Sequence, residues 1–82
     1  MSKLIKFEKE NCPACTMVQN VLDANEVIVE KVNPFEQPKL AVEFGISSVP
    51  VTILVDDEGK EVTRSIGFKP GELEEIINQL NN

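Results

Sequence analysis

Apolar and polar residues alternate along the chain with two periods, and their order predicts an α/β protein. Short runs rich in β-branched residues are typical of strands, and apolar residues three and four positions apart are typical of helices. We expect strands at residues 3–8, 27–32, 51–55 and 61–66, and helices at residues 13–24, about 36–44 and 71–80. The predicted order is βαβαββα, in a single domain that spans residues 1–82.

The connections between these elements limit how the strands can pair. A right-handed strand–helix–strand crossover makes the first two strands parallel. The last two are expected to form an antiparallel hairpin across Asp56–Gly59, in which Gly59 supplies a positive φ angle. Val51–Val55 is apolar almost throughout, which favours burial on both faces. With that strand in the centre, we predict a four-stranded mixed sheet in the order 2-1-3-4, flanked by three helices.

The same pattern predicts the core and the end of the first helix. The bulky residues expected in or near the core are Phe7, Met17, Phe35 and Phe44. Phe68 fits either the core or an exposed apolar patch. Asn25 is expected to end the first helix in the left-handed conformation.

Composition and charge narrow the possible partners. The net charge of -6 argues against nucleic acid, and four Phe without Trp or Tyr offer little for stacking bases. No apolar run approaches the length of a transmembrane helix. The chain enters a strand pattern directly after Met1, with no signal-peptide pattern. We therefore expect a cytoplasmic monomer whose partner is neither nucleic acid nor a membrane.

Both cysteines lie in Asn11–Cys15, between the first predicted strand and the first predicted helix. Cys12 falls at the helix N-cap, where unpaired N–H groups and the helix dipole favour a thiolate. Pro13 suits the first helical position, where its missing N–H has no partner to lose. Cys15 falls one turn on, on the inner side of the helix and within reach of Cys12. We predict that Cys12 attacks a substrate disulfide and that Cys15 resolves the mixed disulfide.

Two other interpretations of the C-x-x-C spacing are weaker. Zinc sites usually take four Cys or His ligands, and this chain has no His and no third Cys. A purely structural disulfide would close a very short loop and constrain the unfolded chain little. At a strand-to-helix junction the motif favours redox chemistry, which requires no metal and no organic cofactor in the protein itself.

The dipeptide Val49-Pro50 stands at the entrance of the third predicted strand. Most X-Pro bonds are trans, so a trans proline that shapes the strand entrance is the common case. The alternative is a cis proline beside the cysteines, with the backbone of Val49 free to pair with a substrate strand.

With these motifs the chain resembles the thioredoxin-like superfamily, and within it the small thioredoxin/glutaredoxin-like redoxins. The matching segments, in the family's order, are Cys12–Cys15, Phe44–Pro50 and Gly67–Leu73. The resemblance covers essentially the whole chain and implies a thioredoxin-like fold. It also implies that Cys12 is the nucleophile, that Cys15 is the resolving thiol and that Pro50 is cis.

The resemblance further implies a substrate groove lined by Ser48, Val49 and Gly67, together with Pro13 and Pro50. Within the superfamily the match is mixed, because Pro13 is similar to glutaredoxins whereas Gly67–Leu73 looks more like thioredoxin. The tryptophan that usually precedes the first cysteine of thioredoxins is Asn11 here, and the tyrosine that glutaredoxins often carry is Ala14.

Lys6 marks the clearest departure from the family pattern. Thioredoxins usually carry a buried aspartate six residues before the first cysteine, which accepts the proton of the resolving thiol; that position is Lys6 here. Strand alternation puts Lys6 on the sheet face opposite Ile5 and Phe7.

The role of Lys6 has two interpretations. Buried unpaired lysines are rare, so the favoured one is that Lys6 reaches solvent or pairs with Glu8, Glu30 or another surface acid. In the other, Lys6 lies near the thiols and tunes their ionisation by stabilising the Cys12 thiolate, or acts as a neutral base. Lys31 looks like the family's lysine near the missing aspartate and is a second candidate for tuning the thiols.

The leading hypothesis is a thiol–disulfide oxidoreductase that reduces disulfide-containing protein substrates and is recharged by a flavin-dependent thioredoxin reductase. The alternative is a glutaredoxin coupled to glutathione. A third possibility is a non-enzymatic subunit with a thioredoxin fold that docks on a partner. Intact Cys12 and Cys15 argue against this third possibility, because a docking module needs no pair of thiols.

Overall fold

The secondary structure follows the predicted order, and the computed structural model describes all 82 residues. The elements are β1 (Lys3–Phe7), α1 (Pro13–Ala24), β2 (Val29–Val32), α2 (Pro38–Glu43), β3 (Val51–Val55), β4 (Glu61–Ile66) and α3 (Pro70–Asn81). The strands form one sheet in the order β2-β1-β3-β4. β1 pairs in parallel with β2 and antiparallel with β3, and β3 pairs antiparallel with β4. The predicted mixed sheet and its strand order are confirmed.

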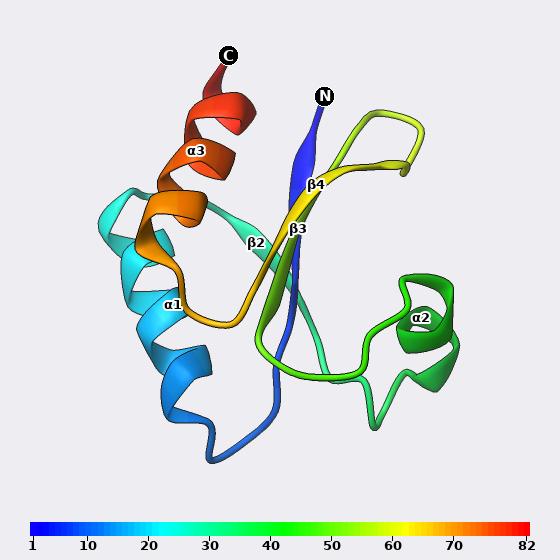
Figure 1. Ribbon diagram of the computed structural model, residues 1–82. Helices are drawn as coiled ribbons and strands as arrows, with labels where there is room; N and C mark the ends of the chain where they lie inside the picture. Colours follow the sequence, from blue (N-terminus) through cyan, green and yellow to red (C-terminus); the bar gives the residue numbers. More distant parts are fainter.

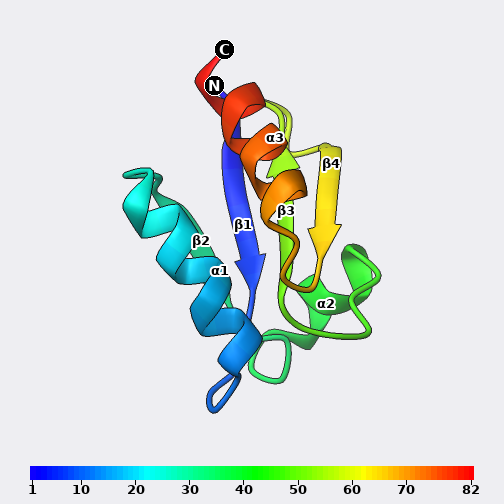
Figure 2. The same ribbon diagram turned by 60° about the vertical axis from the view of Figure 1, so that its left-hand side comes forward.

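Helices cover both faces of the sheet, as Figures 1 and 2 show: α1 and α3 lie side by side on one face, and α2 lies on the other. The core has two parts that follow this division. Under α1 and α3 it comprises Leu4, Val18, Leu22, Leu54, Leu73, Ile76 and Ile77. On the α2 side it comprises Ile5, Phe7, Val32, Val51, Ile53 and Val55. All five residues of β3 are buried, because this central strand has a helical layer on each side.

Each helix begins at a proline, since the first helical N–H would have no partner within the helix. The end of α1 differs from the prediction. Asn25 is not left-handed: its φ is -95°, and the next residue, Glu26, takes the positive φ of 57°. Asn25 instead closes the helix by donating its side-chain amide to the carbonyl of Val21 over 2.8 Å. β2 also begins two residues later than predicted, because the N–H of Val27 donates back to Leu22 at the helix end.

The four bulky residues expected in or near the core divide evenly. Phe7 is fully buried, and Phe44 packs against it with ring centroids 5.8 Å apart. The predictions for Met17 and Phe35 are wrong, because these side chains are 47% and 79% exposed. Met17 lies off the stripe by which α1 faces the sheet, and Phe35 lies in the turn after β2. Phe68, which the sequence left open, packs against the core under α1 and α3.

Candidate active site

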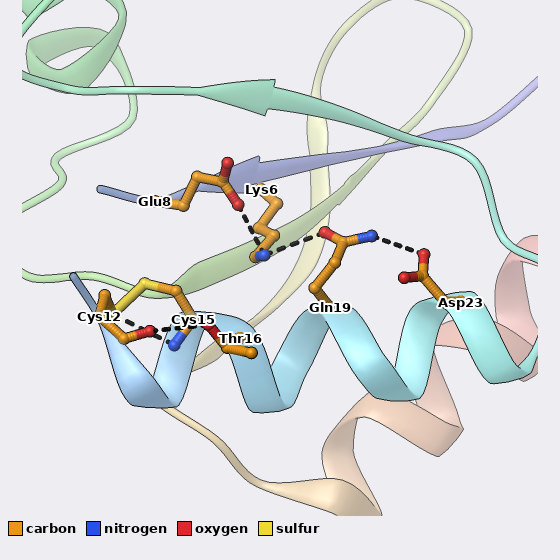
Figure 3. Close-up of polar contacts among 7 residues, drawn as sticks. All are labelled: Lys6, Glu8, Cys12, Cys15, Thr16, Gln19 and Asp23. Carbon is orange, nitrogen blue, oxygen red and sulfur yellow. Dashed lines mark hydrogen bonds and ion pairs between the residues drawn. A yellow bond between two sulfur atoms is a disulfide. The ribbon is translucent and has the colours of Figure 1, made fainter. Parts of the chain in front are cut away.

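The two cysteines form a disulfide at the start of α1 (Figure 3). Cys12 is the N-cap residue, with an extended backbone, and Pro13 follows it in the first turn. The N–H of Cys15 donates to the sulfur of Cys12 over 3.1 Å, as the predicted N-cap position requires. Their Cα atoms are 5.2 Å apart, so one helical turn holds both sulfurs in bonding range.

The two sulfurs differ in their surroundings. Cys12 is partly exposed, whereas Cys15 is 4% exposed and belongs to the inner face of the helix. A partner can therefore approach Cys12 but not Cys15. Cys12 also has the helix N-terminus behind it, which stabilises negative charge on its sulfur after reduction.

Lys6 lies beneath this helix and is only 1% exposed. The expectation that it reaches solvent is wrong, although its expected ion pair with Glu8 is present, with Nζ 2.6 Å from the carboxylate. Lys6 also donates to the side-chain oxygen of Gln19 over 3.0 Å. Gln19 in turn donates to Asp23 over 2.8 Å, and Figure 3 shows the chain of contacts from Glu8 through Lys6 and Gln19 to Asp23. The ammonium can be buried because Glu8 neutralises its charge and Gln19 accepts a hydrogen bond from it.

A cleft of about 290 Å³ brings this buried cation together with the disulfide. Its lining includes Lys6, Glu8, Cys12, Cys15 and Gln19. From the sequence, Glu8 was named only as an ion-pair partner of Lys6, and Gln19 was not singled out. Two simple spacings point to them: Glu8 follows Lys6 by two residues on the same strand face, and Gln19 follows Cys15 by one helical turn.

Lys31, the other candidate for tuning the thiols, lies in β2 beside Lys6 in the parallel register. It is exposed, and it lines a different depression, which it shares with Glu8 but not with the cysteines. Of the two lysines, only Lys6 therefore lines the cleft that contains the sulfurs.

The loop before β3 carries the remaining candidate residues. The Val49–Pro50 peptide bond is cis, as the resemblance implied. Pro50 is buried, and its carbonyl accepts a hydrogen bond of 2.8 Å from the N–H of Gly67, whose φ is 81°. Ser48 is exposed and Val49 is partly buried; both line a cavity of about 340 Å³ that also includes Phe35. Pro13 is exposed beside Cys12.

The described side chains contain no group of three or more His, Cys, Asp or Glu placed to hold a metal ion. None of the three helices has the length and apolar character needed to cross a membrane.

Comparison with known proteins identifies the family. No protein-family model matches the chain. The chain is 47% identical over 78 residues to the SPbeta prophage-derived thioredoxin-like protein YosR of Bacillus subtilis, covering 95% of this chain and 98% of that one. It is 42% identical over 82 residues to the thioredoxin of Chlamydia caviae, covering 93% and 79% of the two chains. The chain belongs to the thioredoxin family.

Solved structures agree with this assignment. The crystal structure of a thioredoxin from Nicotiana alata superposes with a TM-score of 0.80 at 31% identity, covering 95% of this chain and 71% of that one. The chain therefore has the α/β thioredoxin-like fold, and the resemblance read from its sequence is confirmed. The protein is a thioredoxin-like redox protein whose redox group is the Cys12–Cys15 disulfide.

Proposed function

We propose that this thioredoxin-family protein reduces disulfide bonds in protein substrates, with Cys12 as the nucleophile and Cys15 as the resolving thiol. The observation that carries the proposal is the asymmetry across the disulfide. Cys12 is accessible at the N-cap and receives an N–H, whereas Cys15 is buried one turn behind it. An exposed thiolate is suited to attack a partner, and a shielded thiol is suited to wait for the mixed disulfide.

The reaction runs in two exchanges. The Cys12 thiolate attacks one sulfur of the substrate disulfide, and the other substrate sulfur leaves as a thiolate that takes up a proton. Cys15 then loses its proton and attacks the sulfur of Cys12, which releases the second substrate sulfur. The substrate gains two electrons and two protons, and the protein ends with the Cys12–Cys15 disulfide seen in the structure.

The substrate groove of this proposal consists of Pro13, Ser48, Val49, Pro50 and Gly67. Two features support it. No hydrogen bond within the chain uses the backbone N–H or C=O of Val49, which leaves both groups free for an extended substrate segment. The Gly67 N–H bond to the Pro50 carbonyl joins the two loops that contribute to the groove.

The electron donor of the proposal is a thioredoxin reductase, because relatives along most of the chain are named thioredoxins. We propose that the protein works as a single-domain monomer in the cytoplasm, where such a donor regenerates the dithiol after each turnover. Pro13 directly after Cys12 is the one feature that favours glutathione instead, so glutathione is the competing donor in the test.

A donor comparison tests this function. The protein is supplied with one protein disulfide substrate and either NADPH with thioredoxin reductase or glutathione with glutathione reductase and NADPH. We expect NADPH consumption to depend on this protein in the first mixture. Turnover confined to the glutathione mixture would make the protein a glutaredoxin, and turnover in neither mixture would refute the reductase function.

A trapping experiment tests the roles of the two thiols. The reduced Cys15→Ser variant is expected to accumulate a covalent mixed disulfide with the substrate, because its Cys12 attacks and nothing resolves the product. The reduced Cys12→Ser variant is expected to trap almost none, since Cys15 is buried. Equal trapping by the two variants would contradict the assignment. Full activity of the Cys12→Ser, Cys15→Ser double variant in the host would favour a docking role.

A further inference from the structure

We propose that Lys6 is a buried cation shared between Glu8 and the redox thiols, and that it stabilises the thiolate formed when the Cys12–Cys15 disulfide is reduced. Glu8 is the competing anion that limits this stabilisation. The inference rests on the proposed redox function and assigns a tuning role to two residues that do not themselves exchange electrons.

The hydrogen bonds of Lys6 carry the first part of the argument. A lysine ammonium has three N–H donors. Glu8 forms an ion pair with it at 2.6 Å, and the side-chain oxygen of Gln19 accepts one N–H over 3.0 Å. Thr52 lies directly across from Lys6 in the β1–β3 pairing, but its buried hydroxyl has no hydrogen-bond partner and so does not take the third. At least one donor of Lys6 therefore remains for the cleft that Lys6 lines together with both cysteines.

The charges around the cleft carry the second part. Its ionisable lining consists of Lys6, Glu8, Lys9 and Glu10 besides the cysteines. Lys9 and Glu10 are exposed and opposite in sign, and Glu8 is 30% exposed. Asp23 reaches the site only through Gln19. Lys6 is the one fully buried charge, so water and salt screen its field least.

Reduction changes the charge next to Lys6. In the disulfide form neither sulfur is charged, and Glu8 is the only anion that Lys6 contacts. A reducing dithiol gives up two electrons and two protons and becomes a disulfide. The Cys12–Cys15 bond breaks, one sulfur takes one of the protons, the other sulfur becomes a thiolate, and the second proton goes to water. The thiolate is a second anion in the cleft that Lys6 lines, and the Lys6 ammonium attracts it. Lys6 therefore favours the reduced protein, which makes its reduction potential less negative.

The same cation assists the second exchange. While Cys12 is tied to the substrate, Cys15 must lose its proton to attack. A nearby opposite charge favours the charged form of a titrating group, and Lys6 lines the same cleft as Cys15. Lys6 thus promotes formation of the Cys15 thiolate. At this stage Cys12 is in the mixed disulfide and carries no negative charge for the helix N-terminus to stabilise.

The shared cation predicts effects of opposite sign at its two partners. Lys6→Met removes the charge that stabilises the thiolate. Glu8→Gln keeps a side-chain oxygen for Lys6 but removes the competing negative charge, so more of the Lys6 field acts on the sulfur. The double variant is expected to have a thiol–disulfide equilibrium close to that of Lys6→Met, because Glu8 acts on the thiolate by way of Lys6. Lys3→Met is the matched control, since Lys3 is exposed on the same strand and pairs with Glu30 at 3.1 Å, away from the cleft.

Two measurements on each protein test the proposal. The first equilibrates the protein with glutathione buffers and quantifies its free thiols after alkylation. The second follows the ultraviolet absorbance of the thiolate as pH is raised. We expect Lys6→Met to shift the thiol–disulfide equilibrium toward the disulfide by about tenfold, or about 30 mV, and to move thiolate formation to higher pH. Glu8→Gln is expected to move both in the other direction, and Lys3→Met to change neither.

If Lys6→Met and Glu8→Gln shift the thiol–disulfide equilibrium in the same direction, the proposal is overturned. A loss of packing would shift both variants alike, whereas a shared charge shifts them in opposite directions. An unchanged equilibrium in both would overturn it as well. Circular dichroism checks the fold of each variant, and Lys6→Gln replaces Lys6→Met if the latter does not fold. These measurements need no reductase and no protein substrate, so failed turnover with normal shifts would refute only the proposed function.

Discussion

Thr52 offers a sharp test of how polar groups are accommodated in this core. Its side chain is completely buried in the central strand, and its hydroxyl is the one buried side-chain oxygen or nitrogen without a hydrogen-bond partner. Thr52→Val replaces that hydroxyl with a methyl group of similar size. The variant should therefore remove a desolvation cost without opening a cavity.

The expected change in unfolding free energy follows from the burial of the Thr52 hydroxyl, and a neighbouring residue in the sheet provides the control. A buried hydroxyl without a partner costs about 1–3 kcal/mol, and we expect Thr52→Val to recover roughly 1 kcal/mol of it. In a domain of this size that is a rise in melting temperature of about 4–8 °C. Ser65 is the matched control, because it pairs with Thr52 across β3 and β4 and is equally buried, but its hydroxyl donates to Glu72 over 2.7 Å.

Thermal and urea unfolding of the oxidised protein measure both effects. Thr52→Val is expected to be stabilised and Ser65→Ala to be destabilised by about 1 kcal/mol, since the second loses a made hydrogen bond. The urea dependence of the unfolding free energy should stay unchanged in both variants. A lower melting temperature for Thr52→Val would refute the reasoning, because it would mean that the hydroxyl has a partner in the folded protein.

Three further predictions concern other parts of the chain. Leu73→Ala, in the fully buried face of α3, should lower the unfolding free energy by about 2–5 kcal/mol in denaturant titrations. Gly67→Ala should cost about 1–2 kcal/mol by the same assay, since a side chain is strained at φ 81°. The hydrogen bond from Arg64 lowers the pKa of Glu61 from its ordinary 4.5, so Glu61 adds stability above that pH and loses it as pH falls through the lower folded value. As pH falls, Glu61→Gln should therefore lose less unfolding free energy than the unaltered protein. An identical pH dependence of the two proteins would count against a stabilising Glu61–Arg64 pair.

The elements that could be predicted from the sequence are those with a local cause. Val51–Val55 reads as a buried central strand because every position is apolar or small enough to pack on both faces. Pro13 favours the start of a helix for a local reason, since its missing N–H and restricted φ suit the first turn. The N-cap position of Cys12 follows from the same local rule, and so does the inward placement of Cys15 three residues later.

The wrong predictions for Phe35 and Asn25 have different physical causes. Phe35 is apolar enough for a core, but it lies in the turn after β2, where its side chain stays exposed. Glu26 takes a positive φ that local preference assigned to Asn25, because the side chain of Asn25 is used to close the helix.

The sequence by itself determined the order of elements, the strand pairing and the redox pair at a helix start, because these depend on periodicity and spacing along the chain. Only the tertiary structure decided the place of Lys6. A lysine in a strand usually reaches water, and here α1 covers it while Glu8 and Gln19 satisfy it. Glu8 is local to Lys6, but α1 contributes both the cover and Gln19, so the sequence around Lys6 alone could not reveal that it lies in one cleft with the two sulfurs.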